Sequence, residues 1–271
     1  MPVISYRDLT TLEEFAAVVQ LERDIWGPAY DDVVPVSILA VSAHIGGILI
    51  GAFDGDRMIG FVYSLPGIKH GKPTQWSHMA GVTPEYRSAG IGFQLKLLQR
   101  ERALKAELDL IQWTYDPLQA MNAHLNFAKL GVVAEEYGVN LYGVSASPLH
   151  GGNPTDRFVA DWWIRKPHVE QRLRGAAPLA SVMTVEPAGR AQIGGEWLEP
   201  CAIDLSLEAK RLSVDIPMGF TEMLSRAPEL ALAWRMATRE IFTTYFGRGY
   251  RAVEFFLDRP ARKGAYLLVR T

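Results

Sequence analysis

A short stretch with two glycines constrains this chain more than any other part of it: Arg87, Ser88, Ala89, Gly90, Ile91 and Gly92. An apolar, strand-like segment (residues 76–82) precedes it, and leucines recur at helical spacing in residues 93–107 after it. A strand therefore leads through a glycine loop into a helix. Such a loop directs several backbone N–H groups and the positive end of the helix dipole at one place.

The chemistry of this loop suits a bound phosphate. Glycine lets an anion approach the backbone closely, and Arg87 adds planar donors that match phosphate oxygens. The loop is not a Walker motif, because no Gly-Lys-Ser/Thr follows, and it is not the dinucleotide fingerprint, because Leu95 replaces the third glycine. The residues predict a pyrophosphate site, and the alternative is a simple tight turn.

The stretch from Arg87 to Gly92 resembles the Gln/Arg-x-x-Gly-x-Gly/Ala signature of the GNAT superfamily of acyl-CoA-dependent N-acyltransferases. The preceding residues 82–86 resemble the strand end and turn that lead into that signature. The resemblance covers roughly residues 45–165, and the chain is similar to a longer subgroup of predicted acetyltransferases. It implies acetyl-CoA or another acyl-CoA as co-substrate. Some similar proteins are thought to acylate amino acids, including with a succinyl donor.

Length and charge exclude several classes of function. The chain has 271 residues, of which 48% are hydrophobic, so it can bury a large core. Its formal net charge of -2 gives no reason to expect nucleic-acid or membrane binding. Cys201 is the only cysteine, so an intramolecular disulfide is impossible. The first residues lack a signal-peptide pattern, and we expect a cytoplasmic protein.

Strand and helix patterns alternate along the first part of the chain. Thr10 or Thr11 is expected to cap a helix over residues 12–26. Asp54-Gly55-Asp56 predicts a hairpin between two apolar strands. The remaining predicted elements are a helix over 37–44, strands over 75–82, 108–114, 132–142 and 154–164, and a helix over 118–130 that ends at Gly131. This order predicts the α/β class, and the resemblance implies a GNAT-like mixed sheet that splays open beside the loop.

A connector rich in arginine, glycine and proline predicts a domain boundary near residue 170. We expect a GNAT-like, acyl-CoA-binding domain over residues 1–168 and a smaller C-terminal α/β subdomain over residues 175–271. The predicted strands of this subdomain are 182–185, 198–205, 211–216, 252–257 and 265–269, and its predicted helices are 220–226 and 228–246. It has two alternative roles, closing the acceptor pocket or forming a homodimer surface.

The resemblance assigns several residues to the acyl-CoA. Main-chain groups of Ala80, Gly81 and Val82 would bind the pantetheine arm and the acyl carbonyl. Asn122 and Asn126 would contact the cofactor from the helix after the fifth strand. The acyl group would pass directly to a small amine in a ternary complex, so that the enzyme gains from proximity and no protein nucleophile is needed.

The acid and the base are less defined. The family's acidic tyrosine stands four residues before a glycine, where this chain has Phe127, which cannot donate a proton. Tyr137 and Tyr142 are the candidate replacements, Tyr115 is a further one, and a structural role is the alternative for each. His78 is the candidate base, because histidine titrates near neutrality. The alternative for His78 is a hydrogen-bonded strand histidine. His124 is a second candidate base, and its alternative is a side chain that faces solvent.

Three residues are candidates for binding the acceptor. Glu22 and Trp26 end the first helix and would face the acceptor, with Glu22 also able to relay a proton through water; the alternatives are a solvated glutamate and a packed tryptophan. Arg157 would bind a carboxylate of an amino acid or of a succinyl donor. Its alternative is a salt bridge with Asp156 or between domains. No residue cluster has metal-ligand spacing, so we expect no metal.

Three functions therefore compete. The first is an acyl-CoA N-acyltransferase that transfers an acetyl or succinyl group to a small amine, for example an amino acid. The second is a non-catalytic acyl-CoA-binding module, which Phe127 favours. In the third, the glycine loop is only a turn and the second half of the chain mediates assembly.

Overall fold

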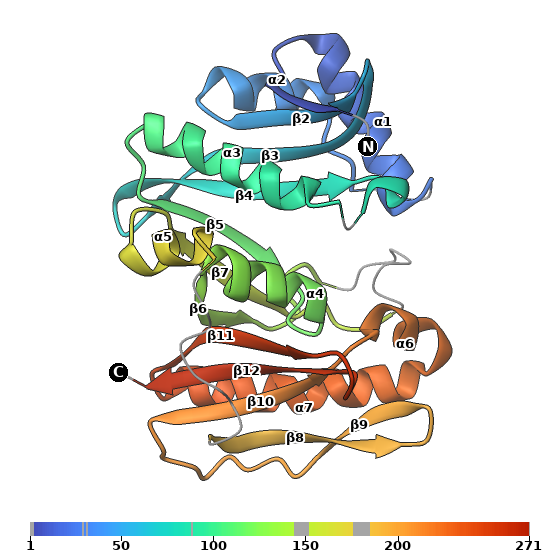
Figure 1. Cartoon of the computed structure of the whole chain (residues 1–271), viewed down its shortest axis with the longest axis vertical. Helices are drawn as coiled ribbons and strands as arrows, with labels where there is room; N and C mark the ends of the chain where they lie inside the picture. The colour runs from blue at the N-terminus through green and yellow to red at the C-terminus, as the bar shows by residue number, and fades with distance from the viewer. Residues whose placement is uncertain are drawn as a thin grey trace. The chain divides into compact units, whose positions relative to one another are not determined.

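A computed structural model of the protein describes residues 3–28, 30, 32–87, 89–143, 152–175 and 185–270. The chain divides into two compact units, Met1–Trp113 (unit 1) and Thr114–Thr271 (unit 2). Both units combine strands with helices (Figure 1), so the predicted α/β class is confirmed. The domain boundary predicted at residues 168–175 lies inside unit 2.

Unit 1 contains a sheet whose first four strands are antiparallel neighbours in chain order, and β5 adds a parallel edge. The strands are β1 (Ile4–Asp8), β2 (Ile48–Asp54), β3 (Arg57–Lys69), β4 (Lys72–Val82) and β5 (Leu110–Tyr115). The turn between β2 and β3 is the hairpin that Asp54-Gly55-Asp56 predicted, because glycine supplies the positive φ (+57°) that such a turn requires.

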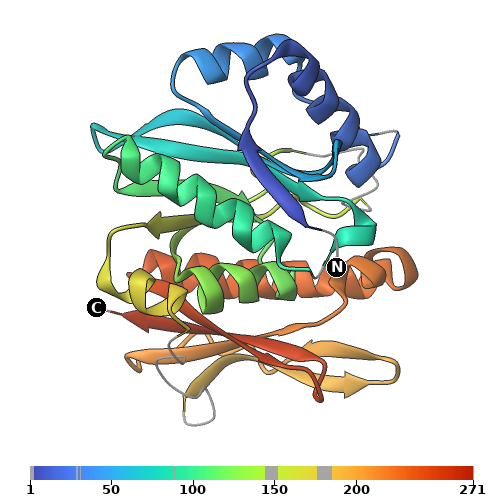
Figure 2. The ribbon, with the colours of Figure 1, turned by 45° about the horizontal axis from the view of Figure 1, so that its top comes forward.

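Helices cover both faces of this sheet: α1 (Leu12–Trp26) and α2 (Val36–His44) lie on one face and α3 (Ile91–Lys105) on the other (Figure 2). The predicted bounds of α1 are confirmed. Thr11 accepts a hydrogen bond from the Glu14 backbone, and the Glu14 carboxylate accepts from the Thr11 backbone in return. This capping box fixes where α1 begins and thereby which of its side chains face the sheet.

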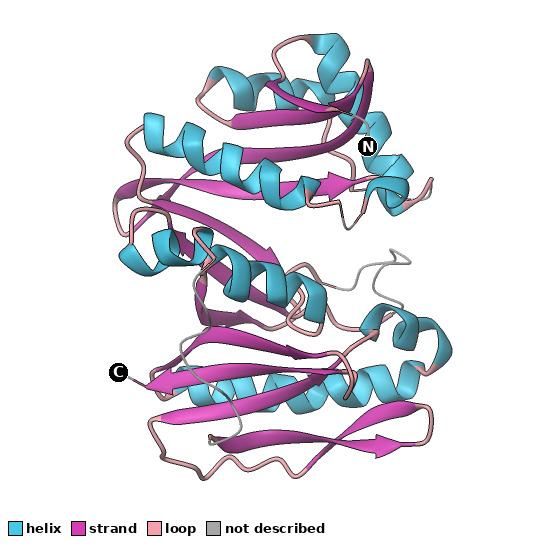
Figure 3. Cartoon of the chain, viewed as in Figure 1, coloured by secondary structure: helices cyan, strands magenta, loops and turns pink. Residues whose placement is uncertain are grey.

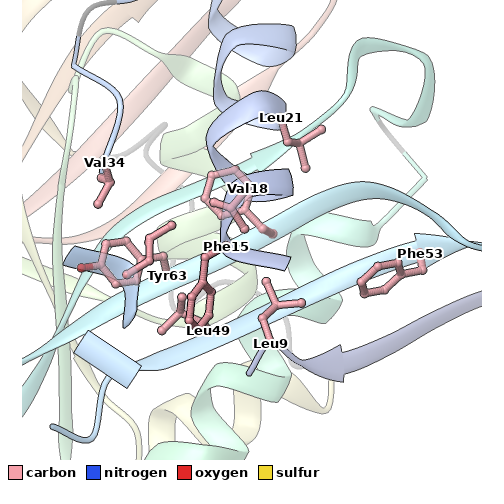
Figure 4. Close-up of a cluster of buried hydrophobic side chains, with 10 residues drawn as sticks. Leu9, Phe15, Val18, Leu21, Val34, Leu49, Phe53 and Tyr63 are labelled. Atoms are coloured by element: carbon pink, nitrogen blue, oxygen red, sulfur yellow. The ribbon is translucent and has the colours of Figure 1, made fainter. Parts of the chain in front are cut away.

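The core of unit 1 lies between α1, α2 and the sheet. Figure 4 shows Tyr63 beside Leu49 and Phe15, with Val18 on the facing helix and with Leu9 and Phe53 farther along the sheet. Burial of side chains of this size stabilises the fold by about 1.5–3 kcal/mol each. The core therefore holds α1 firmly on strands β3 and β4.

The buried side of α3 differs from the expectation. Leu98 and Leu104, two of the leucines whose helical spacing predicted an apolar side together with Leu95, are only half-buried. The buried positions are Ile91, Leu95, Lys96, Gln99 and Ala103. The prediction was wrong because the helix places two polar residues where it faces the sheet.

Unit 2 begins with the end of β5 and continues through α4 (Ala120–Ala123), η2 (His124–Leu130), β6 (Val133–Gly138), β7 (Arg157–Trp163) and α5 (Pro167–Leu173). The segment η2 is π-helical, so the helix predicted over residues 118–130 is neither uniform nor complete. Gly131 ends it with a φ of +74°, as predicted. The connector predicted near residue 170 is partly helical, since α5 reaches Leu173.

The remaining strands of unit 2 are β8 (Glu186–Gly194), β9 (Trp197–Cys201), β10 (Arg211–Pro217), β11 (Tyr250–Asp258) and β12 (Lys263–Arg270). Strand order within the unit is β7-β6-β11-β12-β10-β8-β9. The helices α6 (Phe220–Arg226) and α7 (Pro228–Gly247) match their predicted ranges closely, and α7 runs along the sheet (Figure 3). Strand β8 was not predicted, and the predicted strand 182–185 falls mostly outside the described residues.

Candidate functional site

Strands β4 and β5 pair over a very short distance. Gln75 pairs with Ile111 and Trp76 with Gln112, and β5 then parts from β4. From residue 77 to residue 82, β3 is the only strand paired with β4 within the described part of unit 1. One edge of β4 therefore presents backbone N–H and C=O groups to a ligand. This is the splayed sheet that the resemblance implied.

A β-bulge lies at the start of this open edge. Tyr63 of β3 pairs with Met79 and Ser64 with Ser77, so His78 is an extra residue in β4. Bulges bend a strand and redirect side chains. The exposed His78 lies edge-on to the Tyr63 ring, with 5.8 Å between ring centroids. Desolvation by its surroundings lowers the pKa of His78, so the imidazole is neutral at pH 7 and can accept a proton.

The open edge of β4 leads into the glycine loop. After a short turn, η1 (Pro84–Tyr86), the chain passes Arg87 and reaches Gly90, which has a φ of +81° and precedes α3. No side chain among the described residues caps α3, and its first turn carries no acidic residue. The dipole and the N–H groups at this end are therefore available to an anion. Arg87, Ala89 and Gly90 are exposed there, whereas Ser88 lies outside the described residues.

Gly92 and Gly81 differ in the space around them. A Cβ on Gly92 would meet only Val82 Cγ2, at 4.0 Å, and the φ of Gly92 is not positive. The fold itself does not require glycine there, so the open space suits a ligand. A Cβ on Gly81 would instead come within 2.7 Å of Ile25 Cδ1. Gly81 lets α1 pack on β4, beside exposed Ala80 and half-buried Val82.

Glu22 is fully buried on the α1 side of the sheet. Its Oε2 accepts a hydrogen bond from the Val34 backbone at 2.9 Å, and its Oε1 has no partner among the described residues. Burial raises the pKa of Glu22 to about 7. The alternative of a solvated glutamate is wrong. The spacing of Phe15, Val18 and Glu22 along the apolar side of α1 is the signal that could have revealed this burial.

Aromatic residues lie near this carboxyl, whose charge acts on Tyr30 and Tyr63. Trp26 packs on Tyr30, with ring centroids 5.2 Å apart, and edge-on against Phe61 at 6.1 Å. The Tyr63 hydroxyl is 2.6 Å from the Ser42 hydroxyl, and burial together with the Glu22 charge raises the pKa of Tyr63. The structure therefore brings Glu22, Trp26 and His78 together around Phe61 and Tyr63. An ammonium ion suits a carboxyl among aromatic rings.

A buried lysine that the sequence analysis missed lies on the α3 side of the same strand. Lys96 donates to Ser77 Oγ at 2.8 Å and to Gln99 Oε1 at 3.1 Å. All three side chains are buried. A lysine among leucines on an amphipathic helix gives little warning of burial, because long side chains normally extend to solvent.

Tyr137, one of the two tyrosines proposed as the acid, is engaged in unit 2. Its hydroxyl donates to Asp156 Oδ2 at 2.7 Å. Asp156 also accepts two hydrogen bonds of 2.8 Å from Arg239 and one from the Asn140 backbone. Burial and the Asp156 charge raise the pKa of Tyr137. These contacts give the phenol a structural role, which opposes proton donation.

Arg157 and Tyr142 lie together at the start of β7. The Arg157 guanidinium lies 5.6 Å from the centre of the Tyr142 ring, and the exposed Tyr142 hydroxyl is 2.7 Å from Thr114 Oγ1. The alternative salt bridge with Asp156 is wrong, because Asp156 pairs with Arg239. Within the described ranges, Arg157 forms no ion pair. Burial lowers its pKa.

The other candidates in unit 2 have mixed surroundings. Asn122 is exposed and Asn126 is buried. Phe127 is buried against Tyr115 and Tyr266. The Tyr115 hydroxyl lies 3.1 Å from that of Tyr266, and burial raises its pKa well above the usual value. His124 has a buried Nδ1 without a described partner, and burial lowers its pKa.

Metal-ligand clusters and membrane-spanning helices are both absent from the described residues. No three His, Cys, Asp or Glu side chains among them gather closely enough to hold a metal ion. None of the helices in this part of the chain combines the length and the apolar character that crossing a bilayer requires.

Comparisons with known proteins give matches to solved structures alone. No family model matches the chain, and no curated protein does. One similar structure is yncA from Salmonella typhimurium with its cofactor acetyl-CoA, with a TM-score of 0.49 and 13% identity over 65% of this chain and 99% of that chain. Another is the ribosomal-protein-S18-alanine N-acetyltransferase from Escherichia coli, with a TM-score of 0.48 and 14% identity over 60% and 94%.

A third similar structure is the paia N-acetyltransferase from Thermoplasma acidophilum in complex with coenzyme A. Its TM-score is 0.43, with 16% identity over 59% of this chain and 98% of that chain. All three TM-scores lie below 0.5, and the functional argument therefore rests on the geometry of this chain.

Proposed function

We propose that the protein is an acyl-CoA-dependent N-acyltransferase of the GNAT type, which transfers an acetyl or succinyl group directly to a small amine. One observation carries this proposal: the open edge of β4 runs into an uncapped helix N-terminus through a glycine turn. A backbone edge for an amide-bearing arm and a cluster of N–H groups for a pyrophosphate, in series, match the two halves of coenzyme A.

In this proposal, the N–H groups of the first turn of α3 bind the pyrophosphate, and Arg87 adds charge-assisted hydrogen bonds. Gly92 leaves room for the close approach of the phosphate oxygens. The β4 backbone from Ala80 to Val82 pairs with the pantetheine amides. A backbone N–H beside the bulge at His78 would stabilise the oxyanion of the tetrahedral intermediate.

The amine would lie on the α1 side of β4, where Glu22, Trp26 and His78 lie around Tyr63. Glu22 would attract the ammonium ion, and the neutral imidazole of His78 would remove its proton. The free amine then attacks the thioester carbon while both substrates are bound. Proximity supplies much of the rate, because two bound reactants behave as one molecule.

The proposal is tested by calorimetric titration of the protein with acetyl-CoA, succinyl-CoA and free coenzyme A. We expect binding by the wild type and at least tenfold weaker binding by Arg87→Glu and by Gly92→Ala. Gly92→Ala is the more informative variant, because alanine fits the unliganded fold at position 92. Alanine also has a higher helix propensity than glycine. Only a ligand in close contact with the backbone would clash with the alanine side chain at position 92.

Gly247→Ala is the matched control. Gly247 also lies in a helix with no atom within 4 Å of an added Cβ, so this variant should bind coenzyme A like the wild type. If no coenzyme A species binds to the wild type, the loop is only a turn and the proposal fails. Equal affinity of Gly92→Ala and the wild type would place the ligand elsewhere.

The finer assignment concerns a carboxylate on the substrate. Arg157 has no carboxylate partner within the described residues, since Asp116 pairs with Arg235 and Asp156 with Arg239. A carboxylate of an amino-acid acceptor or of a succinyl group would supply one. Arg157→Lys should raise KM by roughly tenfold or more for the substrate that carries the carboxylate, because lysine cannot form the paired hydrogen bonds. Unchanged KM values for acceptor and donor would exclude this role; Arg211→Lys, at an exposed arginine of β10, is the control.

A non-catalytic acyl-CoA-binding module is the second candidate, and Phe127 favours it. Phe127 occupies the position of the family's acid and is buried among aromatic rings, so it contributes packing alone. Binding of acyl-CoA without release of free coenzyme A, in the presence of a broad panel of amines, would support this function over transfer.

A further inference from the structure

Lys96 lies at the point where strands β4 and β5 part. The last two pairs between these strands are Gln75–Ile111 and Trp76–Gln112, so Ser77 and Trp113 come next on the two strands. Lys96 contacts both of them: its Nζ is 2.8 Å from Ser77 Oγ and 3.9 Å from the centre of the Trp113 ring. The ammonium therefore occupies the fork between the strands, entirely within unit 1.

This lysine is buried, and it has no acidic contact among the described residues. Its side chain is 6% exposed, and Ser77, Gln99 and Trp113, the groups that face it from β4, α3 and β5, are all uncharged. Burying an ammonium in this way is costly, since desolvation disfavours its charge. Burial alone lowers the pKa of Lys96 to about 7. A hydrophobic residue would be more stable here, which points to a function for the amine.

The fork is also where the proposed function places the reacting bond. The open edge of β4 begins at Ser77, and the bulged His78 follows directly. The position at which the family has its acid holds Phe127, which has no proton to give. A proton donor for the sulfur of coenzyme A is thus missing from its usual place.

We propose that Lys96 donates a proton to the sulfur of coenzyme A as the thioester bond breaks. This inference rests on the proposed function. The amine nitrogen bonds to the acyl carbon, the C–S bond breaks, and its electron pair goes to sulfur. Sulfur takes a proton from Lys96 Nζ, directly or through the Ser77 hydroxyl. The surplus protons of the amine pass to the base on the α1 side, and Lys96 regains its proton from water when coenzyme A leaves.

The direction of transfer is favourable. A thiol ordinarily has a pKa of about 8.5, above the value of about 7 for Lys96. The proton therefore prefers sulfur by roughly thirtyfold. An acid with a pKa near the working pH is also protonated often enough to act in each turnover.

The first experiment tests proximity without turnover. Ser77→Cys is incubated with the symmetrical disulfide of coenzyme A, and mixed-disulfide formation is measured by mass spectrometry. We expect modification of Cys at position 77 and protection by acetyl-CoA. Thr74→Cys is the matched control, because Thr74 is equally buried on β4 but lies before the fork. Native Cys201, in unit 2, is the internal control.

The second experiment measures release of coenzyme A from acetyl-CoA, with water or an amine as acceptor, between pH 6 and 9. The wild-type rate should fall above about pH 7 as Lys96 loses its proton. Lys96→Met should lower the rate by about a hundredfold or more and remove that fall, with acetyl-CoA affinity within about threefold of the wild type. Lys96→Arg keeps the charge and should be equally slow, because arginine does not give up its proton.

Lys105→Met, at an exposed lysine of the same helix, should behave like the wild type. Because Lys96→Met removes a buried charge, its melting temperature should equal or exceed that of the wild type. A wild-type rate and pH profile in Lys96→Met would overturn the inference. So would an unmodified Ser77→Cys variant that still binds coenzyme A. If the wild-type protein binds no coenzyme A, the proposed function itself is wrong.

Discussion

A carboxyl and an ammonium are buried on opposite sides of the same strand. Glu22 lies on the α1 side of the sheet, and Lys96 contacts Ser77 of β4 on the α3 side. Neither forms an ion pair among the described residues, and burial moves the pKa of each to about 7. Groups with such values cost folding free energy and are typical of sites that move protons.

These two residues give unit 1 an unusual dependence of stability on pH. The folded pKa of Glu22 is raised, so its cost grows from about pH 4.5 to pH 7 and then stays constant. The folded pKa of Lys96 is lowered, so its cost is complete below pH 7 and declines as the pH rises toward the unfolded value. The free energy of unfolding should therefore pass through a minimum near pH 7.

We predict that Glu22→Gln removes the acidic side of this minimum. Between pH 5 and 7 the wild type should lose about 2 kcal/mol that the variant keeps, because glutamine does not ionise. Denaturant unfolding followed by circular dichroism at several pH values measures this difference. Glu13→Gln, at an exposed position of the same helix, should retain the wild-type profile. A profile of Glu22→Gln parallel to that of the wild type would show that the carboxyl is solvated.

At the scale of elements, the sequence correctly predicted the helix, the hairpin and the loop whose formation depends on a few neighbouring residues. Helix α1 was predicted with its bounds because its apolar spacing and its capping box lie within a few residues. The hairpin at Asp54-Gly55-Asp56 and the glycine loop before α3 were predicted for the same reason. Each depends on backbone conformations that a few residue types favour.

Elements that depend on distant partners were missed. The bulge at His78 arises from the register of β4 against β3, and nothing in the local sequence marks an extra residue. Strand β8 has a glycine-containing, mixed pattern and gains its order from β9 and β10. The pairing of Asp156 with Arg239 joins residues 83 positions apart, so the adjacent Arg157 was the natural but wrong alternative.

At the scale of the whole chain, two ion pairs with buried carboxylates join α7 to earlier segments of unit 2. Arg235 forms two hydrogen bonds with Asp116, at 2.8 and 2.6 Å, and Arg239 forms two with Asp156. Breaking a buried pair by removing one partner typically costs about 3–5 kcal/mol, because the other charge stays buried. These pairs fix the position of α7 in unit 2.

The Tyr137–Asp156 hydrogen bond gives the last prediction, which separates a structural tyrosine from a catalytic one. Tyr137→Phe should lower the free energy of unfolding by roughly 1.5–3 kcal/mol, since the phenol donates to a buried carboxylate. Hydrogen exchange should show faster opening of α7 amides in unit 2 and no change in α3 amides in unit 1. Tyr142→Phe, at an exposed tyrosine, is the control with almost no cost. Release of coenzyme A within about tenfold of the wild type in Tyr137→Phe would exclude the acid role, whereas a loss of a hundredfold or more with unchanged α7 exchange would restore it.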